Sequence, residues 1–286
     1  MGSQHRPLLF AVFSFVVCIG AARAEAPQRV VSIGGEVTEI VYALGQADRV
    51  VATDTTSLFP AAARKTPKVG YMRNLAAEGI LSLRPDLVIL TGSAGPKPTL
   101  DQLREARIPM ISFEEVFAIE AIQTKVRTIA EVLEVPEAGE DILKTVDAEW
   151  AEAQSTIASF EDTPRLLFFF SLGDGSPKAA GRDTSADAVI QLIGGENVFA
   201  EETGFKAFSF EAAVAADPDY ILVMGHNAQR LGGIDKVATL PALAPTRAAR
   251  EGQIVAVDAG AVMTFGLRTP TGLLELARQV HQPASQ

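Results

Sequence analysis

A long segment with almost no chain-breaking residues separates two blocks of alternating strands and helices. Residues 118–155 contain one glycine, Gly139, and one proline, Pro136. Apolar residues recur in this segment at steps of three and four, the period of an amphipathic helix; they are Ile119, Ile122, Val126, Ile129, Val132 and Leu133, with Ile142, Leu143 and Val146 continuing toward Trp150. The pattern predicts one long helix, or two helices with a break at Pro136, joining the two blocks.

Short apolar stretches predict strands in both blocks. Before the long helical segment, strands are predicted at residues 29–33, 49–53, 85–90 and 109–112, with helices at 38–44 and 99–106. After it, the alternation resumes with the segments 165–172, 184–193, 209–216, 219–224 and 253–257, and a C-terminal helix starts near residue 271. This alternation is typical of βαβ units and of a mostly parallel sheet that is buried on both faces.

An internal repeat relates the two blocks. Residues 78–90 and 211–223 each contain a glutamate, a Pro-Asp pair that begins seven residues later, and an apolar strand. Such repetition indicates two similar lobes. In parallel sheets the ligand crevice lies at the carboxyl ends of the strands. We therefore predict an α/β fold with two Rossmann-like lobes joined by one long helix, and a ligand cleft between the lobes.

The N-terminus has the pattern of a secretory signal. His5 and Arg6 form a short basic start, residues 8–20 are apolar, and residues 22–24 read Ala-Arg-Ala, a small-x-small cleavage sequence. The apolar run is 13 residues long, whereas a membrane-spanning helix needs about 20. We expect a cleaved signal peptide and a periplasmic mature protein, divided into a signal peptide at 1–24, an N-terminal lobe at 25–117, a linking helix at 118–160 and a C-terminal lobe at 161–286.

Composition restricts the kind of site and partner that the mature chain can have. The full sequence has one cysteine, Cys18, and it lies inside the predicted signal. The mature chain therefore has no disulfide and no thiolate metal site. A lipid-attachment site needs small residues before its cysteine, whereas the bulky Val16 and Val17 precede Cys18, so lipid attachment there is disfavoured. The other alternative to a cleaved signal is an uncleaved membrane anchor. The formal net charge of −10 argues against nucleic acid as a partner.

The chain resembles a known family at several places. The repeated glutamate and Pro-Asp-strand segments, the linking helix and the export signal look like the periplasmic binding proteins of ABC importers for cobalamin, siderophores and haem. Lys68-Val-Gly-Tyr-Met-Arg-Asn-Leu, residues 177–187 and residues 265–268 look most like the haem-binding branch. The resemblance covers essentially the whole mature chain. It implies a monomer without enzymatic activity that captures haem and delivers it to an importer permease in the cytoplasmic membrane.

Tyr71 is the candidate ligand for haem iron. It lies in the loop 65–74, between two predicted strands. A phenolate oxygen is a hard anionic donor, and tyrosine is one of the residue types that hold haem iron. Ferric iron and a neighbouring cation favour the phenolate; Arg73 can supply that charge or bind a haem propionate, and Lys68 can do likewise. The alternatives are a tyrosine that packs on the loop rim and an arginine solvated at the surface.

Histidines are too few for a bare-metal site. The mature chain has His226 and His281, whereas zinc or manganese carriers use several histidines together with carboxylates. His226 and Asn227 follow the predicted strand 220–224, so either can contact the porphyrin edge or a propionate; a capping or surface-loop histidine is the alternative. By resemblance, some haem-binding relatives hold two stacked haems, with a tyrosine ligand from one lobe and a histidine ligand from the other. Residues 171–176, where that histidine would be expected, contain none, so this mode would require His226 as a substitute ligand.

Glu78 and Glu211 are candidates for permease docking. By resemblance, one surface glutamate on each lobe contacts arginines of the permease, and these two residues match those positions. Two anionic groups would orient the body over the transporter. Both also lie near predicted helix starts, where a carboxylate interacts favourably with the helix dipole.

Other functions remain as alternatives. The same fold can bind a ferric siderophore or cobalamin, although Tyr71 favours haem. A secreted hydrolase or oxidoreductase lacks support, because the chain has no Gly-x-Ser-x-Gly elbow and the mature part has no cysteine. Arg182 and Arg268 are either partners for ligand carboxylates or ordinary ion-pairing residues of the lobes.

Overall fold

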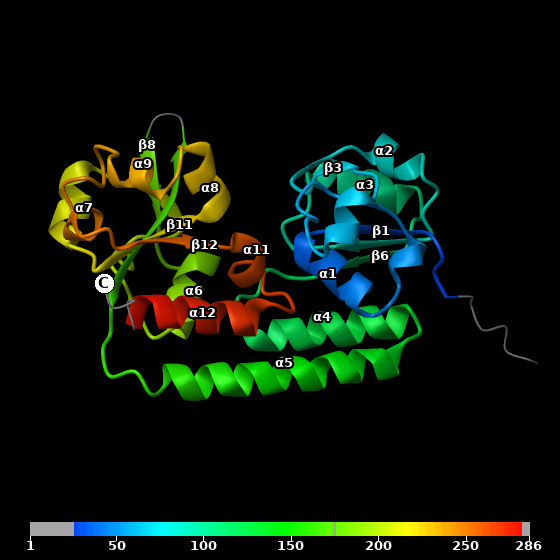
Figure 1. Cartoon of the computed structure of the whole chain (residues 1–286). Helices are drawn as coiled ribbons and strands as arrows, with labels where there is room; N and C mark the ends of the chain where they lie inside the picture. Colours follow the sequence, from blue (N-terminus) through cyan, green and yellow to red (C-terminus); the bar gives the residue numbers. More distant parts are fainter. Residues whose placement is uncertain (1–25, 174–175, 282–286) are drawn as a thin grey trace, which may run out of the picture.

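Two α/β lobes stand side by side on a base of helices (Figure 1). The computed structural model describes residues 26–173 and 176–281; the predicted signal peptide, residues 1–24, lies outside this range. The predicted fold class, two α/β lobes joined by helix, is confirmed. In the described part of the chain, no helix is both long and apolar enough to cross a membrane.

The N-terminal lobe contains a parallel sheet with strand order β2-β1-β5-β6. Every residue of the central strands β1 and β5 is buried, as expected for a parallel sheet covered on both faces. A small antiparallel hairpin, β3-β4, lies outside this sheet. The elements of this lobe are β1 (Val30–Ile33), α1 (Gly35–Ala43), β2 (Val50–Thr53), β3 (Gly70–Tyr71), β4 (Asn74–Leu75), α2 (Ala77–Leu81), β5 (Leu87–Leu90), α3 (Lys97–Glu105) and β6 (Met110–Ser112), with short 3-10 helices at Ala47–Arg49 and Ala61–Lys65.

The C-terminal lobe has the sheet order β10-β8-β7-β11-β12, with β9 paired to β7. Its elements are β7 (Arg165–Gly173), β8 (Ser176–Ala180), α6 (Ser185–Leu192), β9 (Glu196–Asn197), β10 (Phe205–Ala207), α7 (Phe210–Ala216), β11 (Tyr220–Met224), α8 (Gly225–Arg230), α9 (Ile234–Ala238), α10 (Arg247–Arg250), β12 (Ile254–Val257), α11 (Ala259–Val262) and α12 (Thr269–His281). Strands β7, β11 and β12 are parallel, but β8 and β10 are antiparallel additions that the sequence pattern did not predict. The connection from β7 to β8 is too short for the crossover that a parallel neighbour needs.

The helical base consists of α4 (Ile119–Val132) and α5 (Pro136–Ile157), with α12 beside them (Figure 1). Of the two predicted alternatives, the break at Pro136 is the one observed. Glu134 has a positive φ of 57°, which ends α4, and Pro136 occupies the first turn of α5, where its missing N–H costs no hydrogen bond. The 22 residues of α5 extend over about 33 Å, so this helix runs beneath both lobes.

Gly139 marks where α5 crosses α4. A Cβ atom at this position would lie 2.6 Å from the Cβ of Ala130. In the same part of α4, Ile122, Val126 and Ile129 are fully buried in a core cluster that also includes residues of α1. The one glycine of the linking segment is therefore required by helix packing.

Candidate functional site

The carboxyl ends of both parallel sheets point toward the boundary between the lobes. In Figure 1, β1 leads into α1 and β12 leads into α11, and each helix lies on the side of its lobe that faces the other lobe. Loops after strands of this kind carry the ligand-binding residues of α/β folds. A ligand site is therefore expected at these strand ends.

Tyr71 lies on a hairpin fastened to the carboxyl end of β2. The backbone of Thr53 bonds to Pro67 and Val69 at 2.9 Å each, and the Thr55 N–H donates to the Gly70 carbonyl at 2.9 Å. Tyr71 ends β3, pairs with Asn74 of β4 and has 45% of its surface exposed. Its side chain is thus accessible although its backbone is held.

Arg73 belongs to the two-residue turn of this hairpin, between β3 and β4. Its Nη2 atom lies 3.9 Å from Oε1 of Glu115, and both side chains are about half exposed. An exposed ion pair of this length is weak. The structure therefore keeps Arg73 near Tyr71 while leaving its guanidinium able to change partner.

Lys68 is used to hold the loop together. Its ammonium group donates to Oγ1 of Thr53 at 2.7 Å, to the Ser57 carbonyl at 3.0 Å and to the Ala63 carbonyl at 2.9 Å. These three bonds use all three of its donors. Desolvation lowers the pKa of Lys68, with nearby Asp54 acting in the opposite direction. Lys68 supports the loop from which Tyr71 emerges.

A buried carboxylate organises the same loop, and the sequence analysis did not identify it. The Asp54 side chain accepts hydrogen bonds from Gly34 N at 3.0 Å, Thr56 N at 2.9 Å, Thr56 Oγ1 at 2.6 Å and Ser57 Oγ at 2.7 Å. The run Asp-Thr-Thr-Ser directly after a strand was the available signal, because such residues bond to their own backbone in turns.

Besides Tyr71, other loops that follow strands of the N-terminal lobe carry exposed apolar side chains. Leu58 and Phe59 follow β2, Val116 follows β6, and each is at least 44% exposed. The described loops thus present several apolar groups where the N-terminal lobe meets the other lobe. Apolar walls with a few polar groups are typical of small-ligand sites.

On the C-terminal lobe, His226 and Asn227 begin α8, directly after β11. His226 is exposed, but Asn227 is buried and its Nδ2 donates to the Phe170 carbonyl at 2.6 Å. The His226 side chain is therefore accessible, whereas the Asn227 amide ties α8 to β7. The nearby Phe170 ring packs on Phe205, with 4.1 Å between ring centroids.

Glu78 and Glu211 occupy corresponding positions in the two lobes. Each is the second residue of its helix, α2 or α7, and each is exposed. The Ser209 hydroxyl and the backbone N–H of Glu211 lower the pKa of the Glu211 carboxyl. Glu211 is therefore ionised at neutral pH.

The Pro-Asp pairs of the repeat have a structural role. Asp86 accepts the backbone N–H groups of Gln28 at 2.7 Å and Arg29 at 2.8 Å, at the start of β1. In the same way Asp219 accepts the N–H of Arg165 at 2.7 Å, at the start of β7. The repeated aspartate thus fixes the beginning of the first strand of each lobe.

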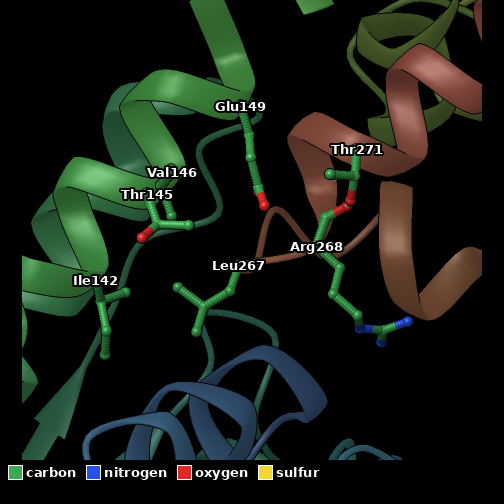
Figure 2. Close-up of a pocket in the computed structure, with 7 residues that line it drawn as sticks. All are labelled: Ile142, Thr145, Val146, Glu149, Leu267, Arg268 and Thr271. Carbon is green, nitrogen blue, oxygen red and sulfur yellow. The ribbon is translucent and has the colours of Figure 1, made fainter. Parts of the chain in front are cut away.

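A cavity of about 280 Å³ lies between α5 and the segment that leads into α12 (Figure 2). It is lined by Ile142, Thr145, Val146, Glu149, Leu267, Arg268 and Thr271. Of these, Arg268 is the one that the sequence suggested as a possible partner for ligand carboxylates, and its side chain points away from the α5 wall (Figure 2). Within the described residues, no three or more His, Cys, Asp or Glu side chains are grouped so as to hold a metal ion.

A family model described as periplasmic binding protein matches residues 30–261. The chain belongs to this family. Among solved structures, this periplasmic binding protein is similar to the haem-binding protein RhuT from Roseiflexus sp. RS-1, with 36% identity, a TM-score of 0.85 and coverage of 90% of this chain and 99% of that one. The periplasmic haem-binding protein BhuT, solved with two haems, has 34% identity and a TM-score of 0.83, over 88% and 97% of the two chains.

A curated relative has a different cargo. The vitamin B12-binding protein of Vibrio campbellii is 26% identical over 222 residues, which are 77% of this chain and 76% of that protein. The resemblance to haem-binding periplasmic proteins is confirmed by the solved structures. The proteins matched are binding proteins rather than enzymes, and their family places this chain outside the cytoplasm.

Proposed function

We propose that this periplasmic binding protein captures ferric haem through Tyr71 and delivers it to an ABC importer. The observation that carries the proposal is the exposed Tyr71 side chain on a fastened hairpin, at the edge of the sheet that faces the other lobe. Phenolate is a suitable axial ligand for ferric haem. The haem-binding structures with at least 34% identity support the same cargo.

The residues near Tyr71 suit the rest of the ligand. Arg73, in the adjoining turn, can donate to a propionate or to the phenolate oxygen, and Glu115 is its present partner. Exposed Leu58, Phe59 and Val116 offer apolar surface to the macrocycle. In this proposal, exposed His226 near the start of α8 contacts the ligand from the second lobe. In this proposal Lys68 and Asn227 act indirectly, because their donors hold the protein's own loops.

Hemin titration followed by absorption tests this assignment. Wild-type protein is expected to give a tyrosinate-type ferric spectrum with a charge-transfer band, and Tyr71→Phe is expected to abolish that band. Tyr42→Phe is the matched control, because the Tyr42 hydroxyl bonds to Thr66 Oγ1 at 2.6 Å within the N-terminal lobe. Equal spectra for wild type and Tyr71→Phe would refute Tyr71 ligation.

Cobalamin is the second candidate, favoured by the B12-binding relatives. Its large corrin ring needs no tyrosinate from the protein, so Tyr71→Phe would leave cobalamin binding nearly unchanged. Parallel calorimetric titrations with hemin and cyanocobalamin distinguish the two. Binding of cyanocobalamin alone would replace haem as the cargo while keeping the transport function.

The export and delivery steps belong to the proposal as well. Residues 1–24 act as a cleaved signal, and the mature protein works in the periplasm as a monomer. Exposed Glu78 and Glu211, one on each lobe, contact the importer permease. The boundaries of 25–117 and 161–286 for the lobes and of 118–160 for the linking helix stay predictions.

A further inference from the structure

One arginine of the C-terminal lobe contacts the N-terminal lobe at two places. The Nε atom of Arg268 lies 3.3 Å from both carboxylate oxygens of Glu39, which is buried in α1. The guanidinium carbon lies 4.2 Å from the ring centroid of Phe59. Arg268 therefore spans the boundary between the lobes and places its flat cation on an aromatic ring.

The arginine itself is held by a fixed second carboxylate. Its Nη1 atom donates to Oδ2 of Asp258 at 3.2 Å. Oδ1 of Asp258 accepts the N–H groups of Gly260 at 3.0 Å and Ala261 at 3.2 Å, which caps α11. Because two carboxylates, Asp258 and Glu39, face the guanidinium, its charge is already balanced. This arrangement favours a positioning role for Arg268 over direct binding of a ligand carboxylate.

The Phe59 ring is held on one side and exposed on the other. It retains 44% exposure although Arg268 lies over it. The loop that carries it is fastened at Ser57, whose hydroxyl donates to Asp54 at 2.7 Å and whose carbonyl accepts from Lys68 at 3.0 Å. The Leu58 carbonyl, between Ser57 and Phe59, accepts from Nε of Arg64 at 2.8 Å.

The Phe59 loop and the Tyr71 hairpin are connected through the same residues. Thr55 N donates to the Gly70 carbonyl at 2.9 Å, and Lys68, three residues before Tyr71, holds the Ser57 and Ala63 carbonyls. The iron-ligand candidate and the aromatic ring therefore emerge from one fastened unit at the edge of the N-terminal lobe. A flat apolar ligand held at Tyr71 has Phe59 as an aromatic surface within this unit.

We propose that Arg268 positions Phe59 as an aromatic contact surface for the face of a bound tetrapyrrole ring. This inference rests on the proposed function. The planar guanidinium, fixed by Glu39 and Asp258, restrains the Phe59 ring from the side of the other lobe. A restrained ring loses less conformational freedom on binding, so the contact slows ligand release.

The test measures release of hemin, and of iron-free protoporphyrin, from loaded protein. Phe59→Leu and Arg268→Lys are each expected to accelerate release of both ligands about three- to tenfold. The double variant is expected to be no faster than the faster single variant, because both changes remove one contact. Phe59→Trp keeps an aromatic ring at this position, so its release should stay as slow as that of the wild type. The tyrosinate spectrum of the hemin complex should be the same in all these variants.

Two controls separate this role from general structure. Leu58→Ala removes a neighbouring exposed apolar group but should be additive with Arg268→Lys. Arg278→Gln changes an arginine of α12 that pairs with Glu152 at 4.0 Å and should leave release unchanged. The denaturation midpoint of every variant is measured to detect poor folding. If Arg268→Lys folds poorly, comparison of Phe59→Leu with Phe59→Trp tests whether the aromatic ring slows ligand release.

The outcomes are distinguishable from failure of the proposed function. Wild-type release rates in Phe59→Leu and Arg268→Lys, or strictly additive effects, would overturn the role of Arg268. If wild-type protein binds neither hemin nor protoporphyrin, the proposed function fails and this inference fails with it. If release is accelerated as expected but Tyr71→Phe keeps its spectrum, the inference stands and the iron ligand is wrong.

Discussion

Tyr71 and Arg73 are brought together by the shortest kind of β-hairpin. Only Met72 and Arg73 form the turn between β3 and β4, and Gly70 has a φ of 108°, which a non-glycine residue would adopt with strain. The sequence motif therefore sets the separation of the two side chains through local backbone geometry. The position of the exposed Tyr71 side chain then depends on the hydrogen bonds that anchor the hairpin to the end of β2.

We predict that Arg73→Ala weakens hemin binding about three- to tenfold, because a charge-assisted hydrogen bond at a half-exposed position is lost. Glu115→Gln should strengthen binding slightly, since it releases Arg73 from its ion pair. Absorption titrations at two salt concentrations measure both effects. An Arg73→Ala variant with wild-type affinity at low salt would exclude a ligand contact for Arg73.

At the scale of elements, the crossing of α4 and α5 fixes the helical base. Arg49 contributes by donating to the Leu133 carbonyl at 2.9 Å, which satisfies an end of α4. The crossing itself depends on the missing side chain of Gly139. Since α5 extends beneath both lobes (Figure 1), a substitution at this contact is expected to affect the stability of the whole molecule.

We predict that Gly139→Ala destabilises the protein by about 1–3 kcal/mol, although alanine is the better helix former by about 1 kcal/mol. The clash with the Ala130 Cβ at 2.6 Å outweighs the gain in helix propensity. Guanidinium denaturation measures the effect. Gly79→Ala in α2 is the control, because a Cβ there meets nothing within 4 Å, and the prediction fails if both variants are stabilised alike.

At the scale of the whole molecule, buried charges lie where the lobes and the base meet. Lys125 of α4 donates to the Phe265 carbonyl at 2.9 Å and to the Thr264 carbonyl at 3.3 Å in the C-terminal lobe. Burial lowers the pKa of Lys125, an effect that Glu36 of α1 partly offsets. Burial also raises the pKa of Glu36 and Glu39, against the attraction of Lys125 and Arg268 respectively.

These shifts predict a pH dependence of stability. Above the ordinary carboxyl pKa of 4.5, folded Glu36 keeps a proton that the unfolded chain has lost. Stability therefore falls as the pH rises from 4.5 through the raised pKa of folded Glu36. Glu36→Gln removes this contribution, so its free energy of unfolding should rise relative to wild type over that interval. Glu78→Gln, at an exposed position, should follow wild type; parallel curves for all three proteins would contradict the prediction.

The proposed docking to the permease is also a property of the whole molecule, because the two proposed carboxylates, Glu78 and Glu211, lie on different lobes. Charge reversal at Glu78 or Glu211 is expected to leave hemin affinity unchanged and to reduce uptake into vesicles containing the importer at least tenfold. Glu140→Lys, at an exposed position of α5, is the control. Normal uptake by the Glu78→Lys, Glu211→Lys double variant would remove both residues from the docking surface.

Features that depend on neighbours along the chain could be predicted from the amino-acid sequence. Helical periodicity with Pro136 predicted the two base helices, and apolar runs flanked by Pro-Asp predicted β5 and β11, because backbone conformation and turn chemistry are local. The motif around Tyr71 likewise predicted a candidate ligand in an accessible loop. The antiparallel strands β8 and β10 were missed, since their pairing depends on a tight connection rather than on periodicity.

The commitment of polar side chains to the protein's own loops became visible in the three-dimensional packing. Lys68 and Asn227 looked equally available in the sequence, but hydrogen bonds to Ser57 and Phe170 commit them to the protein's own loops. Arg268 meets Glu39, 229 residues away, across the boundary of the lobes. Such partners are set by how distant elements pack, so no local pattern reveals them.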